Sequence, residues 1–246
     1  MLHYLWDTVL YHPFVNLLAF IVSVVPGGDL GIAIIILTIL VKIALYPLSQ
    51  RSIESQAKMN LLAPEINKIK QSGGSKEEQA KMTFELYKKH KTNPFSGCFL
   101  VLMQIPIIFA LYYVFYTGIS FDTGILYSFV PVPGELNTMF LGIIDVAGKS
   151  IVLAILAGVS QYFQARYMPK PPTPDSSMSD FAASFQKSMH MQMKYFFPII
   201  VAFISYTISG AIALYWIVNN VFSIGQQLYA NRKNSLVKSV KAEIKE

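Results

Sequence analysis

Residues 30–48 read LGIAIIILTILVKIALYPL, and this run decides the fold class of the chain. It is long enough to cross a bilayer as a helix, and its only charged side chain is Lys42. A charge near the centre of a membrane span costs roughly 2.5 kcal/mol or more. Lys42 therefore needs a polar partner, a water-filled cavity or a route to the lipid headgroups, and the function depends on which of these it has.

The composition is that of an integral membrane protein. The 246 residues are 53% hydrophobic and 14% charged, whereas soluble domains average about 25% charged residues. The single cysteine, Cys98, excludes an internal disulfide and a multi-cysteine metal site. No Lys or Arg precedes Lys42, so we expect neither a secretory signal with a basic start nor an Arg-rich transit peptide.

Five apolar runs are predicted to span the membrane: 30–48, 97–117, 147–166, 194–209 and 211–229. The last two almost touch at Ser209-Gly210. We expect a tight helical hairpin there, in which Gly210 adopts backbone angles that glycine allows. The predicted fold class is an all-α membrane protein with five transmembrane helices.

The stretch from Pro13 to Val25 allows two interpretations. Its length of about thirteen residues and its end at Pro26-Gly27-Gly28 favour an interfacial or re-entrant helix, with residues 1–29 outside the membrane. Extended back to Thr8, the same stretch would make a sixth span.

Basic residues set the expected orientation. Segment 49–93 holds nine Lys and Arg, 118–146 holds none, and both 167–193 and the tail 230–246 are again basic. The positive-inside rule places the three basic segments in the cytoplasm and the N-terminus outside. With five spans, every loop agrees with the positive-inside rule. A sixth span would place the N-terminus in the cytoplasm, although it has no basic residue to favour that side.

Segment 50–92 is predicted to form a cytoplasmic hairpin of two amphipathic helices. Apolar residues recur at helical spacing on both sides of a glycine break at 72–75, and Ser75 and Glu78 have capping-box spacing. Asn93-Pro94 is expected to end the second helix. The hairpin is either a solvated charged loop or a docking surface for a polar or anionic partner.

Two other connecting segments have recognisable composition. Residues 169–177 are rich in proline and predict a flexible connector. The outer segment 118–146 contains Pro131-Val132-Pro133-Gly134, and we expect a loop with short helical pieces.

Polar side chains follow one face of several predicted spans. In the first span, Thr38, Lys42, Tyr46 and Ser49 share a helix face. The other polar positions are Gln104, Gln161 with Gln164, and Trp216, Asn219 or Asn220, Ser223 and Gln227. These stripes favour a shared water-filled cavity in the cytoplasmic half of the membrane.

A simpler interpretation of these residues remains open. Lys42 lies about six residues, roughly 9 Å, from the inner end of its span, so its stem could extend to the headgroups. The amides and hydroxyls could form ordinary interhelical hydrogen bonds, worth about 0.6 kcal/mol each. Tyr215 and Trp216 could belong to an interfacial aromatic belt.

Three segments resemble the YidC-type membrane protein insertases, the Oxa and Alb relatives included. They are ILTILVKIALYPLSQRSIESQAKM at 36–59, LYKKHKTNPFSGCFLVLMQIPIIFALYY at 86–113 and SGAIALYWIVNNVFSIGQQ at 209–227. The resemblance runs from about residue 30 to 227. It implies a five-helix core at 30–229 around a hydrophilic groove that opens to the cytoplasm and to lipid and is closed on the outer side.

The resemblance also implies a function and a set of residues. The family inserts newly made membrane proteins, alone or with the Sec translocon, without enzymatic activity, catalytic residues or a cofactor. The implied groove positions are Lys42, Thr38, Gln104, Gln161, Tyr215, Trp216 and Asn220. The family's basic groove residue is usually arginine, so Lys42 keeps the charge but loses the planar five-donor fork. Gram-negative members carry a large outer domain before the core, and we expect it to be missing here, where about 29 residues precede the core.

The expected partners are nascent membrane proteins, the lipid bilayer, the Sec translocon, and the ribosome or signal recognition particle system through 50–92 and the tail. The expected location is a bacterial plasma (inner) membrane. The alternative is a small channel or transporter, although the polar residues cluster inward and no internal repeat is visible. A nucleotide-driven machine or an intramembrane hydrolase has no support, since GxxxxGK[ST], HExxH and GxSxG strings are absent and no histidine lies in a predicted span.

Overall fold

The computed structural model is a bundle of long helices. It describes residues 6–92, 96–116, 124–134, 136–168, 188 and 191–243. The main helices are α2 (His12–Val24), α3 (Leu30–Leu61), α4 (Ala63–Gln71), α5 (Lys76–Lys89), α6 (Ser96–Tyr116), α7 (Ile151–Tyr167), α9 (Phe197–Ile208) and α10 (Gly210–Glu243). One-turn π-helices, η1 (Asp7–Tyr11) and η3 (Gln192–Phe196), lead into α2 and α9, and a 3₁₀ turn, η2 (Pro26–Gly28), precedes α3. Each predicted span coincides with a helix, which confirms the all-α class.

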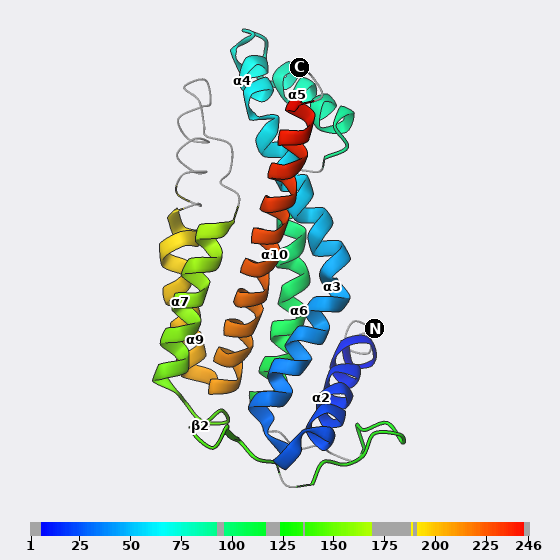
Figure 1. The fold of residues 1–246 in the computed structure, drawn as a ribbon, viewed down its shortest axis with the longest axis vertical. Helices are drawn as coiled ribbons and strands as arrows, with labels where there is room; N and C mark the ends of the chain where they lie inside the picture. Colours follow the sequence, from blue (N-terminus) through cyan, green and yellow to red (C-terminus); the bar gives the residue numbers. More distant parts are fainter. Residues whose placement is uncertain are drawn as a thin grey trace.

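Helix α10 runs through the middle of the bundle. It packs against α3 on one side and α7 on the other, and α7 packs along α9. Figure 1 shows α4 and α5 at one end of the long axis and the strand pair at the other. Most of the large fully buried side chains are apolar, among them Leu18, Leu30, Ile34, Leu37, Leu111 and Val201 from α2, α3, α6 and α9.

Helix α3 is longer than the sequence predicts. The apolar run ends at Leu48, but the helix continues without a break to Leu61. Pro47 lies inside it and removes one backbone hydrogen bond, yet the helix passes through. The change from apolar to charged residues therefore marks a change of environment and not the end of a helix.

Within the predicted hairpin segment 50–92, two helices, α4 and α5, flank the glycine break, and their cytoplasmic location stays a prediction. The capping box at its second helix is confirmed, because Ser75 Oγ accepts from the Glu78 N–H at 3.2 Å and Glu78 Oε2 accepts from the Ser75 N–H at 3.0 Å. The expected end at Asn93-Pro94 and the proline-rich connector 169–177 lie outside the described residues.

The turn between α9 and α10 is at the predicted place, but the predicted reason for its glycine is wrong. Ser209 is extended, with φ −166° and ψ 159°, and Gly210 is not among the residues with positive φ. A Cβ at Gly210 would lie 3.1 Å from Val146 Cα and 3.2 Å from Leu153 Cδ1. Glycine is needed here because another part of the backbone approaches closely.

The outer segment differs from the expected loop with helical pieces. In its described part, β1 (Met139–Phe140) and β2 (Ile144–Asp145) form an antiparallel hairpin. Asp29 ties this hairpin to the start of α3, because its two carboxylate oxygens accept from the Ile32 N–H at 3.0 Å and the Leu141 N–H at 2.8 Å. The Phe140 side chain lies directly over Gly31, where a Cβ would overlap it.

The N-terminal helix is longer than thirteen residues. Together η1 and α2 cover Asp7–Val24, and within the described residues this helix and α3 are the two that are long and apolar enough to cross a membrane. Gln104–Val114 and Gln192–Ile208 are shorter apolar stretches. Whether the N-terminal helix crosses or lies at the interface, and whether five helices span, stay predictions.

Candidate functional site

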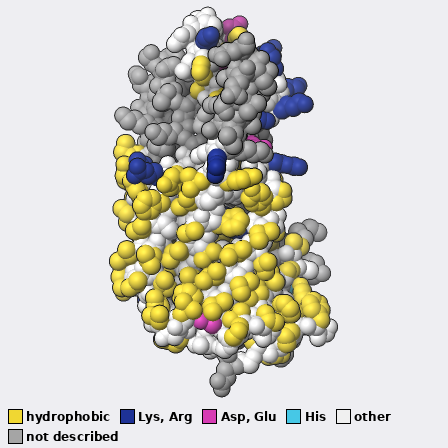
Figure 2. Space-filling view, in the orientation of Figure 1, with side chains coloured by type: hydrophobic (Ala, Val, Ile, Leu, Met, Phe, Trp, Pro, Cys, Tyr) yellow, Lys and Arg dark blue, Asp and Glu magenta, His cyan; other side chains and the backbone are white. Residues whose placement is uncertain are grey.

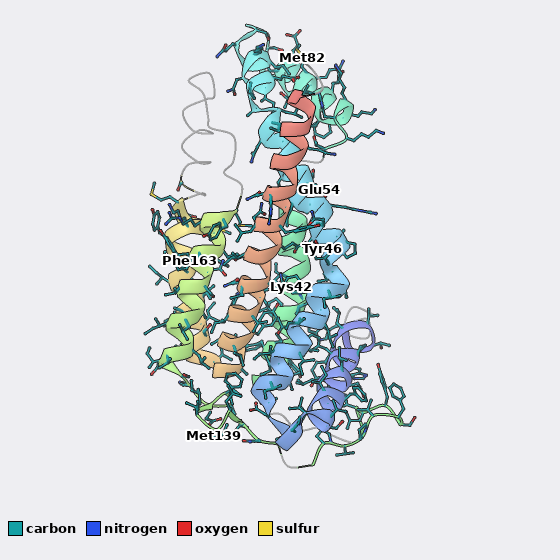
Figure 3. The ribbon with its side chains drawn as sticks, viewed as in Figure 1. Lys42, Tyr46, Glu54, Met82, Met139 and Phe163 are labelled. Atoms are coloured by element: carbon teal, nitrogen blue, oxygen red, sulfur yellow. The ribbon has the colours of Figure 1, made fainter. Side chains whose placement is uncertain are left out.

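Lys42 has a polar partner inside the bundle. Its Nζ donates to Ser223 Oγ on α10 at 2.8 Å, and Ser223 Oγ donates in turn to the Asn219 carbonyl at 2.7 Å. The Lys42 side chain is half-buried. Figure 3 shows Lys42 partway along the bundle's long axis, with Tyr46 and Glu54 successively nearer the α4–α5 end. The ammonium is therefore directed to a neighbouring helix and is not packed only among aliphatic side chains.

A second polar contact joins α3 to α10, seven residues further along α3 and three further along α10. Gln226 Nε2 donates to Ser49 Oγ at 2.8 Å, and Ser49 Oγ donates to Gln226 Oε1 at 3.1 Å. The sequence pattern favoured Gln227 for this stripe, but Gln227 Nε2 donates to Asn231 Oδ1 of its own helix at 2.9 Å. The spacing of three from Ser223 would have identified Gln226.

A neighbouring face of α10 carries a polar contact to α7. Asn220 is fully buried and its Nδ2 donates to Ser160 Oγ at 3.0 Å. On α7, Gln161 Nε2 donates to Gln164 Oε1 at 2.8 Å, which confirms that these two amides share a face. Ser160 was missed because a lone serine in an apolar run carries no distinguishing pattern.

The remaining candidate residues are less closely associated with Lys42. Thr38 is buried and donates to the Ile34 carbonyl of its own helix at 2.6 Å. Tyr215 and Trp216 are only 3% and 7% exposed and belong to the apolar core, which is not the position of an interfacial belt. Gln104 is half-buried on α6. Within the described residues, no group of three His, Cys, Asp or Glu side chains could hold a metal ion.

The family model described as "60Kd inner membrane protein" matches residues 20–238. The chain belongs to the 60Kd inner membrane protein family. Curated members named "Membrane protein insertase YidC" include one from Oleidesulfovibrio alaskensis, 33% identical over 95% of this chain, and one from Anaeromyxobacter sp., 37% identical over 82%. Another, from Clostridium tetani, is 32% identical over 89% of this chain.

The chain spans 40% of the Oleidesulfovibrio protein and 33% of the Anaeromyxobacter protein, but 90% of the Clostridium protein. The matches confirm the resemblance to YidC-type insertases. Membership of the 60Kd inner membrane protein family also identifies the chain as a bacterial inner membrane protein.

Proposed function

We propose that this protein is a membrane protein insertase, which lowers the barrier for newly made membrane proteins to enter the bilayer. The observation that carries the proposal is the Lys42 ammonium, which lies in the apolar part of α3 and is held by Ser223 of the central helix. Relatives covering most of this chain are named insertases.

We place α3, α6, α7, α9 and α10 across the membrane. The support is a set of large apolar side chains at the surface of these helices: Leu40, Ile43, Phe109, Ile155, Val159, Ile199, Phe203 and Val221. Hydrophobic side chains dominate the lower part of the face drawn in Figure 2, and in this view Lys and Arg lie at its upper border and beyond. Such a large apolar surface is costly in water and favourable in lipid. The α4–α5 end is then cytoplasmic and the β1–β2 end is outside.

We place the N-terminal helix at the outer interface. Asn16, in the middle of this helix, donates to the Ile125 carbonyl at 3.0 Å and accepts from the Tyr127 N–H at 2.6 Å. Residues 125–127 belong to the irregular outer connection between α6 and α7. Because lipid-exposed irregular backbone is not tolerated in the hydrocarbon core, a helix tied at its middle to this segment favours the interfacial position over a sixth span.

In the proposed mechanism, a groove open to the cytoplasm exposes Lys42 and Gln104, and the other implied groove residues, Thr38, Gln161, Tyr215, Trp216 and Asn220, lie buried around it. An ammonium has three N–H donors, and one of those of Lys42 is used by Ser223. In the described part of the chain no further hydrogen bond of Lys42 is present, so the other two donors are available to water and to a carboxylate near the start of a client protein. Water in the groove lowers the desolvation cost of the client's polar tail. The client's apolar segment then moves sideways into lipid, driven by burial of its own apolar surface, so the reaction needs no nucleotide.

We propose the α4–α5 hairpin as the docking surface for the ribosome or the signal recognition particle system, and the basic tail 230–246 as a contact for ribosomal RNA. A cavity of about 420 Å³ on the hairpin is lined by both charged and apolar groups, among them Glu78, Lys81, Met82 and Glu85. Removal of 231–246 should weaken ribosome co-sedimentation, and unchanged binding would dismiss the tail's role. Cooperation with the Sec translocon is part of the same proposal.

The test of the proposed function is insertion into liposomes that contain the purified protein. Lys42→Glu should abolish insertion of a single-span client with an acidic tail, measured by protease protection, because the carboxylate repels the tail. Full activity of Lys42→Glu would refute the role of the charge. Ion conductance through the pure protein would instead favour the channel alternative.

A further inference from the structure

We propose that Ser223 is a positioning residue, which holds the Lys42 ammonium at its depth in the bundle and directs its remaining donors to the client. The proposal rests on the proposed function, because it concerns how the same charge is presented. Ser223 itself touches no client; it acts through Lys42.

The hydroxyl of Ser223 is arranged as an acceptor. Its only proton is used in the 2.7 Å hydrogen bond to the Asn219 carbonyl, one helical turn back on α10. Serine and threonine commonly make this bond inside helices. With the proton committed, the oxygen lone pairs remain for the Lys42 Nζ at 2.8 Å. The backbone of α10 therefore fixes the direction in which Ser223 accepts.

Lys42 needs such a partner to stay where it is. A lysine stem is long and flexible, and in a membrane helix it tends to carry its ammonium towards the headgroups. The contact between Ser49 and Gln226 lies nearer the cytoplasmic end of the α3–α10 interface, seven residues along α3 and three along α10. Ser223 anchors the ammonium on the side of that contact that is farther from the cytoplasmic end. The charge therefore stays deep enough to meet a client tail that has already entered the groove.

Loss of Ser223 should therefore change selection by charge more than insertion as such. The positive charge would remain on Lys42, but its position would no longer be fixed. A client with a neutral tail makes no use of that position. The informative quantity is the ratio of insertion of an acidic-tailed client to insertion of the same client with its acidic residues replaced by amides.

This ratio should be measured with the purified full chain in liposomes for five proteins: wild type, Ser223→Ala, Ser223→Thr, Lys42→Gln and Ser160→Ala. Ser160 is a matched control, because it also donates to a carbonyl of its own helix, Ala157 at 2.8 Å, and accepts across a helix interface from Asn220. We expect Ser223→Ala to lower the ratio roughly threefold to tenfold, the net effect of one ordinary hydrogen bond, because the charge of Lys42 itself remains. Ser223→Thr, which keeps the hydroxyl, should restore it, and Ser160→Ala should leave it unchanged.

The outcomes separate the two proposals. If Lys42→Gln lowers the ratio and Ser223→Ala does not, the positioning role is overturned while the proposed function stands. An equal fall in Ser223→Ala and Ser160→Ala would also overturn it, because general loosening of α10 would then explain the effect. If Lys42→Gln itself leaves the ratio unchanged, the proposed use of the charge fails, and the role of Ser223 fails with it.

Discussion

Replacement of Asp29 by alanine should destabilise the end of the protein that carries β1 and β2. Asp29 is 6% exposed, and its carboxylate both caps α3 through the Ile32 N–H and holds the outer hairpin through the Leu141 N–H. Loss of a helix N-cap costs about 1 kcal/mol, and loss of a hydrogen bond to a charged group about 1.5–3 kcal/mol when it is buried. Because the bond to the Leu141 N–H is only partly buried, we expect Asp29→Ala to lower the free energy of unfolding by roughly 2–3 kcal/mol in total. For a chain of this size that lowers the midpoint of thermal unfolding by roughly 4–12 °C.

The assay is thermal unfolding of the purified protein in detergent, with two comparison variants. Asp29→Asn keeps a capping oxygen and should lose less. Asp145→Ala removes another outer carboxylate, whose Oδ1 accepts from the Ala147 N–H at 3.0 Å in an exposed turn, and it should change stability by no more than about 0.5 kcal/mol. An Asp29→Ala midpoint equal to that of Asp145→Ala would refute the idea that Asp29 ties the hairpin to α3.

Three further variants test the packing by the same measurement. Gly31→Ala should lower the free energy of unfolding by about 1–3 kcal/mol because its Cβ overlaps Phe140. Addition of Phe140→Ala to the same chain should relieve part of that loss of stability. If the losses of the two single variants simply add in the double variant, the contact is contradicted. Gly158→Val should lower the unfolding midpoint, because even a single Cβ added at Gly158 would lie 3.0 Å from Ala202 Cβ and from a backbone oxygen of α9. An unchanged midpoint would show that α7 and α9 can move apart with little loss of stability. Ser205→Ala should be neutral or stabilising by up to about 1 kcal/mol, since this hydroxyl is fully buried and has no hydrogen-bond partner in the described part of the chain; a clear loss of stability would mean that the hydroxyl is bonded.

Patterns that depend on neighbouring residues could be predicted from the sequence. The apolar runs predicted the helices, and the spacing of Ser75 and Glu78 predicted a capping box that is present. The polar stripe placed Lys42 on one face of its helix and Ser223 on one face of the last, and these two side chains meet. Helical periodicity alone is sufficient for such predictions.

Features that depend on contacts between distant segments could not be predicted in the same way. The sequence marks Gly210 as permissive, but only the fold shows Val146 and Leu153 beside it. The β1–β2 hairpin was missed because it is held by Asp29, more than a hundred residues earlier in the chain. Gln226 and Gln227 are adjacent and chemically identical, and the rotation of α10 against α3 decides which of them reaches Ser49.

The central claim is that an ammonium held inside the bundle receives the polar tail of a client. The most direct test is to stall a client during insertion, with a photoreactive residue in its acidic tail, and to map the crosslinks on the unaltered protein. The account predicts crosslinks at Lys42 and the adjoining polar residues of α10, including Ser223. Crosslinks confined to the exposed apolar residues Ile43 and Val221, which are 56% and 59% exposed, would contradict it.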